Sequence, residues 1–127
     1  MRGLILLDTD ILIDFFRGYG EAVTFVNKYS SRIILSSIVV AELYAGVKRD
    51  EEQSILENFL SLFRVIPVTT EIAKAGGLYK RTYGKSHGIG LADAIVAATA
   101  EAENAHLTTL NIKHYPMIKD LHPAYQK

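Results

Sequence analysis

The chain has 127 residues, of which 49% are hydrophobic, so it is long enough for one domain with a substantial core and too short for two. It contains no cysteine, which excludes disulfides, thiolate metal ligands and thiol nucleophiles and is typical of a reducing compartment. Its 14 basic and 14 acidic residues cancel, so a polyanionic partner must be bound by a local patch rather than by overall charge. We therefore expect a single domain over residues 1–127.

The first apolar run, Gly3 to Leu7, is interrupted by Asp8 and Asp10 and is too short for a signal peptide or a membrane span. We expect no membrane association and a cytoplasmic protein. A continuous apolar run of this kind is typical of a strand that is buried on both faces of a parallel sheet. After it, Thr9 or Asp10 is expected to cap a helix that begins at residue 11 and ends near residue 18.

Helix and strand patterns alternate along the rest of the chain, which favours a parallel sheet with helices on both faces. We expect helices near 21–29, 37–47, 50–63, 70–83 and 91–103, and strands near 32–35, 65–68 and 106–109. Gly84 is expected in the loop after the fourth of these helices. The helix that ends near Val47 is apolar nearly all round, which predicts packing on several sides. Residues 111–117 should form a turn, and a last short strand is possible near Leu121.

Three carboxylates stand alone in otherwise uncharged, largely apolar stretches of the sequence. Asp8 ends the first apolar run, Glu42 is the only formally charged residue within 33–47, and Asp93 is the only one within 86–100. A buried carboxylate costs several kcal/mol unless it is paired, hydrogen-bonded or bound to a cation. Asp8 follows a strand, where ligands of parallel sheets bind, and Asp93 lies in the first turn of its helix. Together they predict one metal site.

Each acid also has a simpler explanation. Asp8 could end a strand and begin a turn, Asp93 could be a helix N-cap, and Glu42 could pair with a distant lysine or arginine. One cation explains the three together better than three separate roles. The absence of cysteine and the scattered histidines argue against zinc, whereas carboxylates suit magnesium or manganese. Magnesium held by one or two carboxylates accepts phosphate oxygens, so phosphodiester cleavage is the expected chemistry.

Basic residues gather in the segment that leads into Asp93. Between Ile72 and Ala92 there is no acid, whereas acids cluster within 50–57. Two solvated helix faces would give the same pattern, so charge alone does not decide between a solvated face and a polyanion-binding patch. The basic residues of this segment are Lys74, Lys80, Arg81, Lys85 and His87.

The segments 6–14 (LLDTDILID), 37–46 (SIVVAELYAG), 92–100 (ADAIVAATA) and 107–115 (LTTLNIKHY) occur in an order that resembles PIN-domain ribonucleases. The resemblance is specifically to the VapC-type toxins of bacterial and archaeal toxin–antitoxin pairs. Each segment is weak alone, but the ordered set spans nearly the whole chain. The resemblance implies a PIN-like three-layer α/β/α sandwich with a central four- to five-stranded parallel sheet. It also implies an endoribonuclease that depends on Mg²⁺ or Mn²⁺.

The resemblance assigns roles to the acids. Asp8 and Asp93 look like direct metal ligands, and Glu42 looks like the second acid of the site, which binds the metal directly or through water. Asp10 looks like a supporting residue. The resemblance to the last family motif also suggests a hydroxyl contact from Thr109 to the site.

The family often has a fourth acid in its last motif, at the place held here by Asn111 or His114. Asn111 is our fourth catalytic candidate, because an amide can bind a metal-bound water or a neighbouring carboxylate without adding charge. A second metal would then be held weakly, so we expect one tightly bound metal in the resting enzyme.

The resemblance further implies an RNA substrate, a homodimer and inhibition by a small VapB-like antitoxin that can push a basic side chain into the acidic pocket. Apolar side chains could supply such interfaces, although aromatic residues at helical spacing are more often core. The candidates are Phe15, Phe16, Tyr44, Phe59 and Leu60.

Three other functions fit parts of the pattern. Asp8-Thr9-Asp10 imitates the aspartate pair of haloacid-dehalogenase-type phosphatases, but Ile11 and Leu12 follow where that class needs glycine and threonine. A phospho-accepting receiver domain needs an aspartate after its third strand, where this chain has Val68-Thr69-Thr70. An RNA- or antitoxin-binding module with reduced activity is the non-enzyme alternative.

Overall fold

The computed structural model describes residues 3–127 and contains one parallel sheet with the strand order β3-β2-β1-β4. The strands are β1 (Ile5–Leu7), β2 (Ile33–Ser36), β3 (Arg64–Ile66) and β4 (His106–Thr108). All residues of the two inner strands are buried, as their continuous apolar runs predict. Ile5 lies opposite Ile33 on one side and His106 on the other, so the first strand forms the middle of the sheet.

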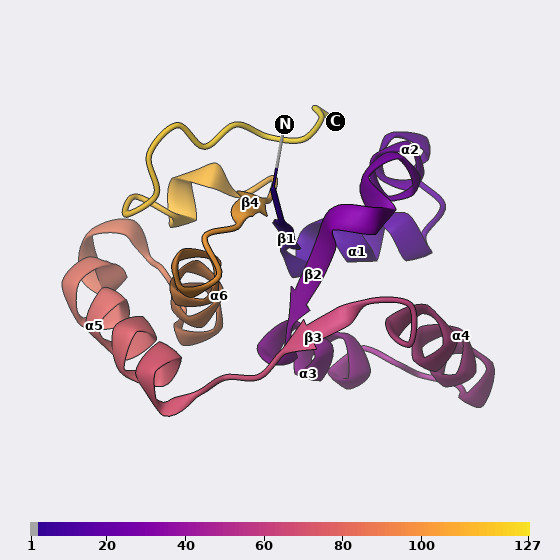
Figure 1. The fold of residues 1–127 in the computed structure, drawn as a ribbon, viewed down its shortest axis with the longest axis horizontal. Helices are drawn as coiled ribbons and strands as arrows, with labels where there is room; N and C mark the ends of the chain where they lie inside the picture. Colours follow the sequence, from indigo (N-terminus) through magenta and orange to yellow (C-terminus); the bar gives the residue numbers. More distant parts are fainter. Residues whose placement is uncertain (1–2) are drawn as a thin grey trace.

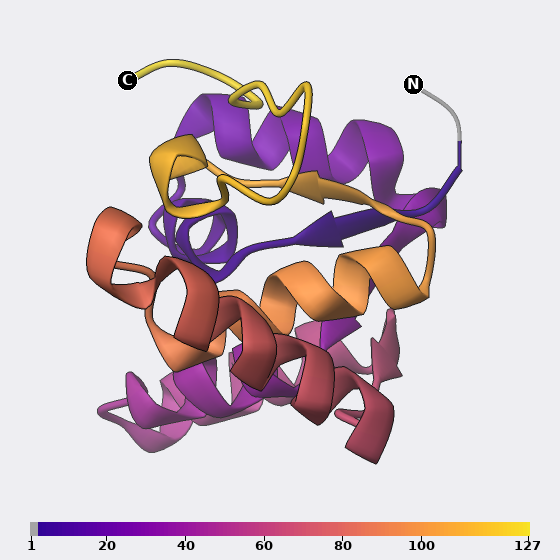
Figure 2. The ribbon, with the colours of Figure 1, turned by 90° about the vertical axis from the view of Figure 1, so that its left-hand side faces the viewer.

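Helices cover both faces of this sheet. Figure 2 shows β1 and β4 between α2 on one side and α6 on the other, with α5 packed outside α6. The predicted three-layer α/β/α sandwich is therefore confirmed, and its sheet has four strands in residues 3–127. Two short 3₁₀ helices, η1 (Ser30–Arg32) and η2 (Ile112–His114), complete the elements in Figure 1. The helices are α1 (Thr9–Phe16), α2 (Gly20–Tyr29), α3 (Ser37–Ala45), α4 (Asp50–Leu60), α5 (Thr70–His87) and α6 (Leu91–Ala102).

The alanine-rich helix α6 lies close to both of its neighbours because its buried side chains are small. Ala94, Ala97 and Ala98 are all buried in the core. On its other side α6 meets α5 at Gly76, where an added Cβ would lie 2.8 Å from Ile95 Cγ1 and 3.1 Å from Ile95 Cα. A side chain at this position would collide with the backbone of α6, so glycine sets the distance between the two helices.

Helix α5 is longer than the sequence predicted. It continues through Gly84 to His87 and ends at Gly88, whose φ of 65° is the left-handed conformation that favours glycine. Our expectation that the helix ends near Tyr83 was wrong, because one glycine inside a helix costs only about 1 kcal/mol. The glycine that ends the helix is the one that adopts a positive φ.

Three further expectations need correction. The residue that caps α1 is Asp8, not Thr9 or Asp10. Helix α3 buries only Val39 and Leu43, so it is not packed on several sides as its composition suggested. No strand forms near Leu121, where the described segment 116–127 consists of turns and irregular backbone. None of the described helices has the length and hydropathy needed to span a membrane.

Candidate active site

Asp8 lies at the carboxyl end of β1 and is the most enclosed of the predicted site carboxylates. Its backbone N–H donates to Thr108 O at 2.9 Å, and its side chain is buried with 4% exposure. Oδ1 accepts a hydrogen bond from the Thr9 N–H at 2.8 Å. Oδ2 accepts from the hydroxyls of Thr109 at 2.9 Å and Tyr115 at 2.7 Å. The carboxylate is thus fixed by donors from both ends of the chain.

Burial raises the pKa of Asp8, and this effect exceeds the lowering by hydrogen bonds from Tyr115, Thr109 and Thr9. The negative charge of Asp93 raises it further. Burial and the nearby charge of Asp8 also raise the pKa of Tyr115 far above its usual range, so its hydroxyl remains a donor. When Asp8 is ionised, its negative charge is therefore shielded from water and lies near a second negative charge, that of Asp93.

Asp10 links the start of α1 to the loop that follows β4. Oδ1 accepts from Ile11 N–H at 2.8 Å, while Oδ2 accepts from Leu110 N–H at 2.8 Å and from the Thr109 hydroxyl at 3.2 Å. Burial, followed by the charge of Asp8, raises the pKa of Asp10 to about 6. These contacts are those of a supporting residue, and Thr109 connects the two aspartates through one hydroxyl.

Glu42 is exposed on α3, so our expectation of an apolar enclosure was wrong. The reason is the position of α3, which buries only one side of the helix. Glu42 is nevertheless joined to the site, because its Oε1 accepts a hydrogen bond from the Thr9 hydroxyl at 2.6 Å. Thr9 stands between Asp8 and Asp10 in the sequence, which places Glu42 beside the start of α1.

Asp93 occupies the first turn of α6, whose N-cap is Gly90, so Asp93 is not a capping residue. Its side chain is 28% exposed, and its Oδ2 lies 3.3 Å from Nδ1 of His114. This approach lacks hydrogen-bond geometry, and His114 Nδ1 is buried without a hydrogen-bond partner among residues 3–127. A histidine therefore faces Asp93 in the last motif, where the family resemblance implies an acid.

Asn111 is exposed, and its side chain makes no hydrogen bond to the described residues of the site. Its backbone N–H donates to the Thr109 hydroxyl at 3.0 Å, so it contributes through the main chain. Sequence reasoning missed Tyr115, which is 1% exposed. In the sequence, the feature that could have indicated Tyr115 is its place at the end of the last motif. A single tyrosine in a polar turn does not by itself predict a specific contact.

The carboxylates do not form a complete ligand cage. Within residues 3–127, no group of three or more acidic or histidine side chains is arranged to hold a metal ion. Magnesium does not need such a cage, since it is usually bound by one or two carboxylates together with waters and substrate phosphates. In the same described range, no lysine or arginine forms an ion pair with Asp8, Asp10 or Asp93. These carboxylate oxygens, which lack a lysine or arginine partner, fit a hard divalent cation.

A second buried carboxylate, Asp14 of α1, has a different environment. It accepts hydrogen bonds from Tyr125 Oη at 2.8 Å and from Lys127 Nζ at 3.0 Å. Burial alone would raise the pKa of Asp14, but these donors and the charges of Lys127 and Arg17 lower it overall. Asp14 and Lys127 therefore form a structural ion pair that joins α1 to the end of the chain.

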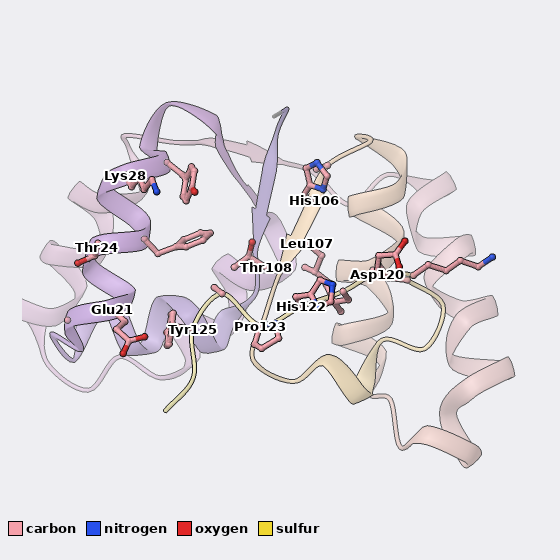
Figure 3. A pocket seen from close by; sticks show the side chains of 18 residues that line it. Glu21, Thr24, Lys28, His106, Leu107, Thr108, Asp120, His122, Pro123 and Tyr125 are labelled. Carbon is pink, nitrogen blue, oxygen red and sulfur yellow. The ribbon is translucent and has the colours of Figure 1, made fainter. Parts of the chain in front are cut away.

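Two pockets lie beside these elements. One of about 830 Å³ lies between α2, β4 and residues 118–125, and none of the predicted site residues lines it (Figure 3). The other, of about 540 Å³, lies between α1, α3 and α4 and includes Glu42 in its lining. The rest of its wall combines apolar side chains, among them Ile13, Phe16 and Ile55, with the charged side chains of Arg17, Lys48, Arg49 and Glu52.

Comparison with known proteins gives consistent matches over nearly the whole chain. The family model described as PIN domain matches residues 5–115. Ribonuclease VapC19 of Mycobacterium tuberculosis is 40% identical over 94% of this chain and 98% of its own length. Ribonuclease VapC10 of the same species is 36% identical over 96% and 93%.

Solved structures agree with these matches. A toxin–antitoxin complex from Klebsiella pneumoniae contains a chain with a TM-score of 0.83 and 28% identity, covering 97% of this chain and 99% of that one. VapBC2 from Rickettsia felis, bound to a DNA fragment from its promoter, has a TM-score of 0.74 and 31% identity over 93% and 95%.

Proposed function

The chain belongs to the PIN domain family, as its four ordered segments predicted, and we propose that it is a metal-dependent endoribonuclease acting as the toxin of a toxin–antitoxin pair. The observation that carries the proposal is the buried Asp8 carboxylate, which has a neighbouring acid, Asp93, and no basic partner in residues 3–127. Relatives named ribonucleases at 36% and 40% identity support the substrate class. With RNA as the substrate, the proposed place of action is the cytoplasm.

In the proposed mechanism, Asp8 and Asp93 would hold Mg²⁺ or Mn²⁺, and Glu42 would contribute directly or through water. When bound, such a cation activates water and stabilises the charge that develops on the phosphate. The hydroxyls of Thr109 and Tyr115 orient Asp8 and favour its ionised form. Asp10, through its bond to Leu110 N–H, keeps the loop after β4 against the start of α1.

The test uses the variants Asp8→Ala and Asp93→Ala in protein purified free of metal. Each should lose metal-dependent RNA cleavage on the order of 10³-fold while the circular dichroism spectrum is retained. Glu51→Ala is the matched control, because Glu51 is an exposed acid of α4 outside the site. Cleavage that is unchanged in both site variants would refute the assignment of the site.

A phosphatase of the haloacid-dehalogenase type is less consistent with this geometry. Its second aspartate must act as a general acid, whereas both Asp10 oxygens accept hydrogen bonds, including those from Leu110 and Ile11 N–H. Hydrolysis of an aryl phosphate monoester without RNA cleavage would favour that function instead. A binding module of reduced activity would cleave neither substrate.

The proposed protein partner is a VapB-like antitoxin, supported by structural neighbours that are VapBC complexes. We place its contact at the pocket between α1, α3 and α4, where Glu42 lies beside apolar side chains. Ile55→Asp, at a pocket side chain with 58% exposure, should reduce co-purification with the antitoxin encoded beside it. Leu62→Asp, at a 75% exposed leucine outside the pocket, should not.

The apolar surface candidates divide by burial. Phe59 is in the core, Phe15 and Leu60 are half-buried, and Phe16 and Tyr44 are exposed at 37% each. Phe16 belongs to the proposed antitoxin pocket, and Tyr44 lies on the uncovered side of α3. The proposed homodimer can be measured by light scattering, with Tyr44→Glu as the variant expected to weaken it.

A further inference from the structure

The C-terminal half of α5 extends beyond its crossing with α6 toward the acidic site. The helices meet at Gly76 and Ile95, and α5 continues to His87. In Figure 2 the strands point toward the side where the last turns of α5, the start of α6 and η2 gather. Lys80 Nζ donates to Ile89 O at 2.8 Å, which holds the connecting loop against α5. The end of α5 is therefore fixed at the edge of the sheet that carries Asp8.

This end of α5 has two exposed cations on one side. Arg81 and Lys85 are four residues apart, so their side chains are neighbours on the helix surface. In residues 3–127 neither forms an ion pair, and residues 72–92 contain no acid that could provide one. Lys80 differs from them because its ammonium group is bound to the carbonyl of Ile89.

Helix stability alone does not explain both cations. A basic residue in the last turn stabilises a helix by interaction with its macrodipole, and Lys85 is in that position. The effect falls off within one turn, whereas Arg81 lies six residues before the end of α5. The interaction with the macrodipole therefore accounts for Lys85 but not for Arg81.

A polyanionic substrate, by contrast, needs such cations here. The carboxylates of Asp8, Asp10, Glu42 and Asp93 repel a phosphate backbone, and the net charge of the chain is zero. Attraction must then come from a local basic surface on the same edge as the acids. We propose that Arg81 and Lys85 bind the phosphate backbone of single-stranded RNA and guide it to the site, an inference that rests on the proposed ribonuclease function.

The test measures binding of an uncleavable single-stranded 2′-O-methyl RNA by fluorescence anisotropy over a range of salt concentrations. The double variant Arg81→Glu/Lys85→Glu should bind at least about tenfold more weakly at low salt than the wild type. The slope of log K against log salt should become less negative by about 1.4, from two lost contacts at roughly 0.7 each on a single strand.

Lys74→Glu is the matched control. Lys74 lies on the same stripe of α5, before the crossing at Gly76, and is about 16 Å along the axis from Lys85. Its effect on the dissociation constant should be below about threefold. An equal loss with Lys74→Glu would overturn the proposal in favour of general attraction to the whole protein. A double variant that changes the oligomeric state in light scattering would overturn it in favour of a protein interface.

The two proposals fail in different ways. Cleavage that requires Asp8 and Asp93 but is insensitive to the Arg81→Glu/Lys85→Glu change would refute this inference alone. The opposite result is RNA binding that depends on Arg81 and Lys85 in a wild-type protein that cleaves no RNA with Mg²⁺ or Mn²⁺. This result would support the RNA-binding inference and refute the proposed ribonuclease function.

Discussion

Asp8 and Asp14 are two buried aspartates at opposite ends of the same short helix, yet the charged side chains beside them have opposite signs. Their exposed fractions are 4% and 5%, and each accepts a hydrogen bond from a tyrosine hydroxyl. Lys127 lies beside Asp14, whose pKa is lowered, whereas Asp8 has Asp93 nearby and a raised pKa. Burial alone therefore does not distinguish the acid of the proposed metal site; the absence of a lysine or arginine partner within residues 3–127 does.

The largest expected difference between the two aspartates is in activity. Asp8→Asn should lower kcat/KM for metal-dependent RNA cleavage on the order of 10³-fold, because the amide lacks the charge that we propose holds the cation. Asp14→Asn should leave kcat/KM within about threefold, since its carboxylate accepts hydrogen bonds from Tyr125 and Lys127 and, within residues 3–127, from no residue of the proposed site. Similar losses in both variants would show that the two acids do not have separate roles.

The next difference is in stability. Asp14→Ala should lower the free energy of unfolding by about 2–4 kcal/mol, because it leaves the Tyr125 hydroxyl unpaired and creates a cavity. Lys127→Met should cost about 1 kcal/mol, since the lysine side chain is 50% exposed and solvent screens the pair. Urea denaturation measures both. The reverse order would mean that the ion pair matters more than the hydrogen bond and packing.

Asp10, which lies beside Asp8, and Asp14 predict opposite effects of pH on the stability of the metal-free protein. The pKa of Asp10, beside Asp8, is raised from 3.8 to about 6, so the folded state binds its proton more tightly than the unfolded state. Stability from this group is present below about pH 4 and is lost as pH rises to about 6, by about 1–3 kcal/mol. The lowered pKa of Asp14 acts in reverse, and its contribution is lost as pH falls through that pKa.

Thermal melts at pH 5 and pH 7 check the part of this expectation that concerns Asp10, whose pKa of about 6 lies between the two values. Mg²⁺ should raise the melting temperature at pH 7, where the carboxylates are ionised, and have a smaller effect at pH 5. Asp8→Asn should remove the effect of Mg²⁺ at both values. A Mg²⁺ effect that persists in Asp8→Asn would place the cation elsewhere.

The smallest expected effect comes from the donor to Asp8. Tyr115→Phe removes one hydrogen bond that lowers the pKa of this carboxyl group, so the acid limb of the pH–rate profile should move to higher pH. Cleavage near neutral pH should fall about tenfold, corresponding to about 1.4 kcal/mol. Tyr125→Phe is the matched control and should leave the profile unchanged.

The position of a site residue could be predicted where it follows from the neighbouring sequence, and could not where it depends on distant parts of the chain. Asp8 and Asp93 could be predicted because their place at a strand end and in a first helical turn follows from the neighbouring sequence. Glu42 has an equally apolar neighbourhood in sequence, but its helix is covered on one side only, which no local pattern reveals. Asp14 was given no role, since its partners Tyr125 and Lys127 lie more than 110 residues away in sequence.

The fold was predicted more completely than the site contacts. Continuous apolar runs and alternating helix and strand patterns are local consequences of burial, and they gave the layers and the parallel sheet. The end of α5 was placed at the wrong glycine, because Gly84 and Gly88 differ only in the backbone conformation that the following loop imposes on them. The Asn111 side chain and the number of bound metals stay predictions, since Asn111 contributes only its backbone to the described contacts.

The close contact at Gly76 fixes α5 against α6 at one point, and the part of the helix that follows extends beyond this contact. The helix extends about 16 Å from this glycine to His87, so a tilt of about 5° would move that end by more than 1 Å. An added methyl group at Gly76 would lie 2.8 Å from Ile95 Cγ1 and 3.1 Å from Ile95 Cα, so α5 would have to shift relative to α6. The position of the end of α5 relative to the acids thus depends on the absence of one side chain, at a residue remote from both.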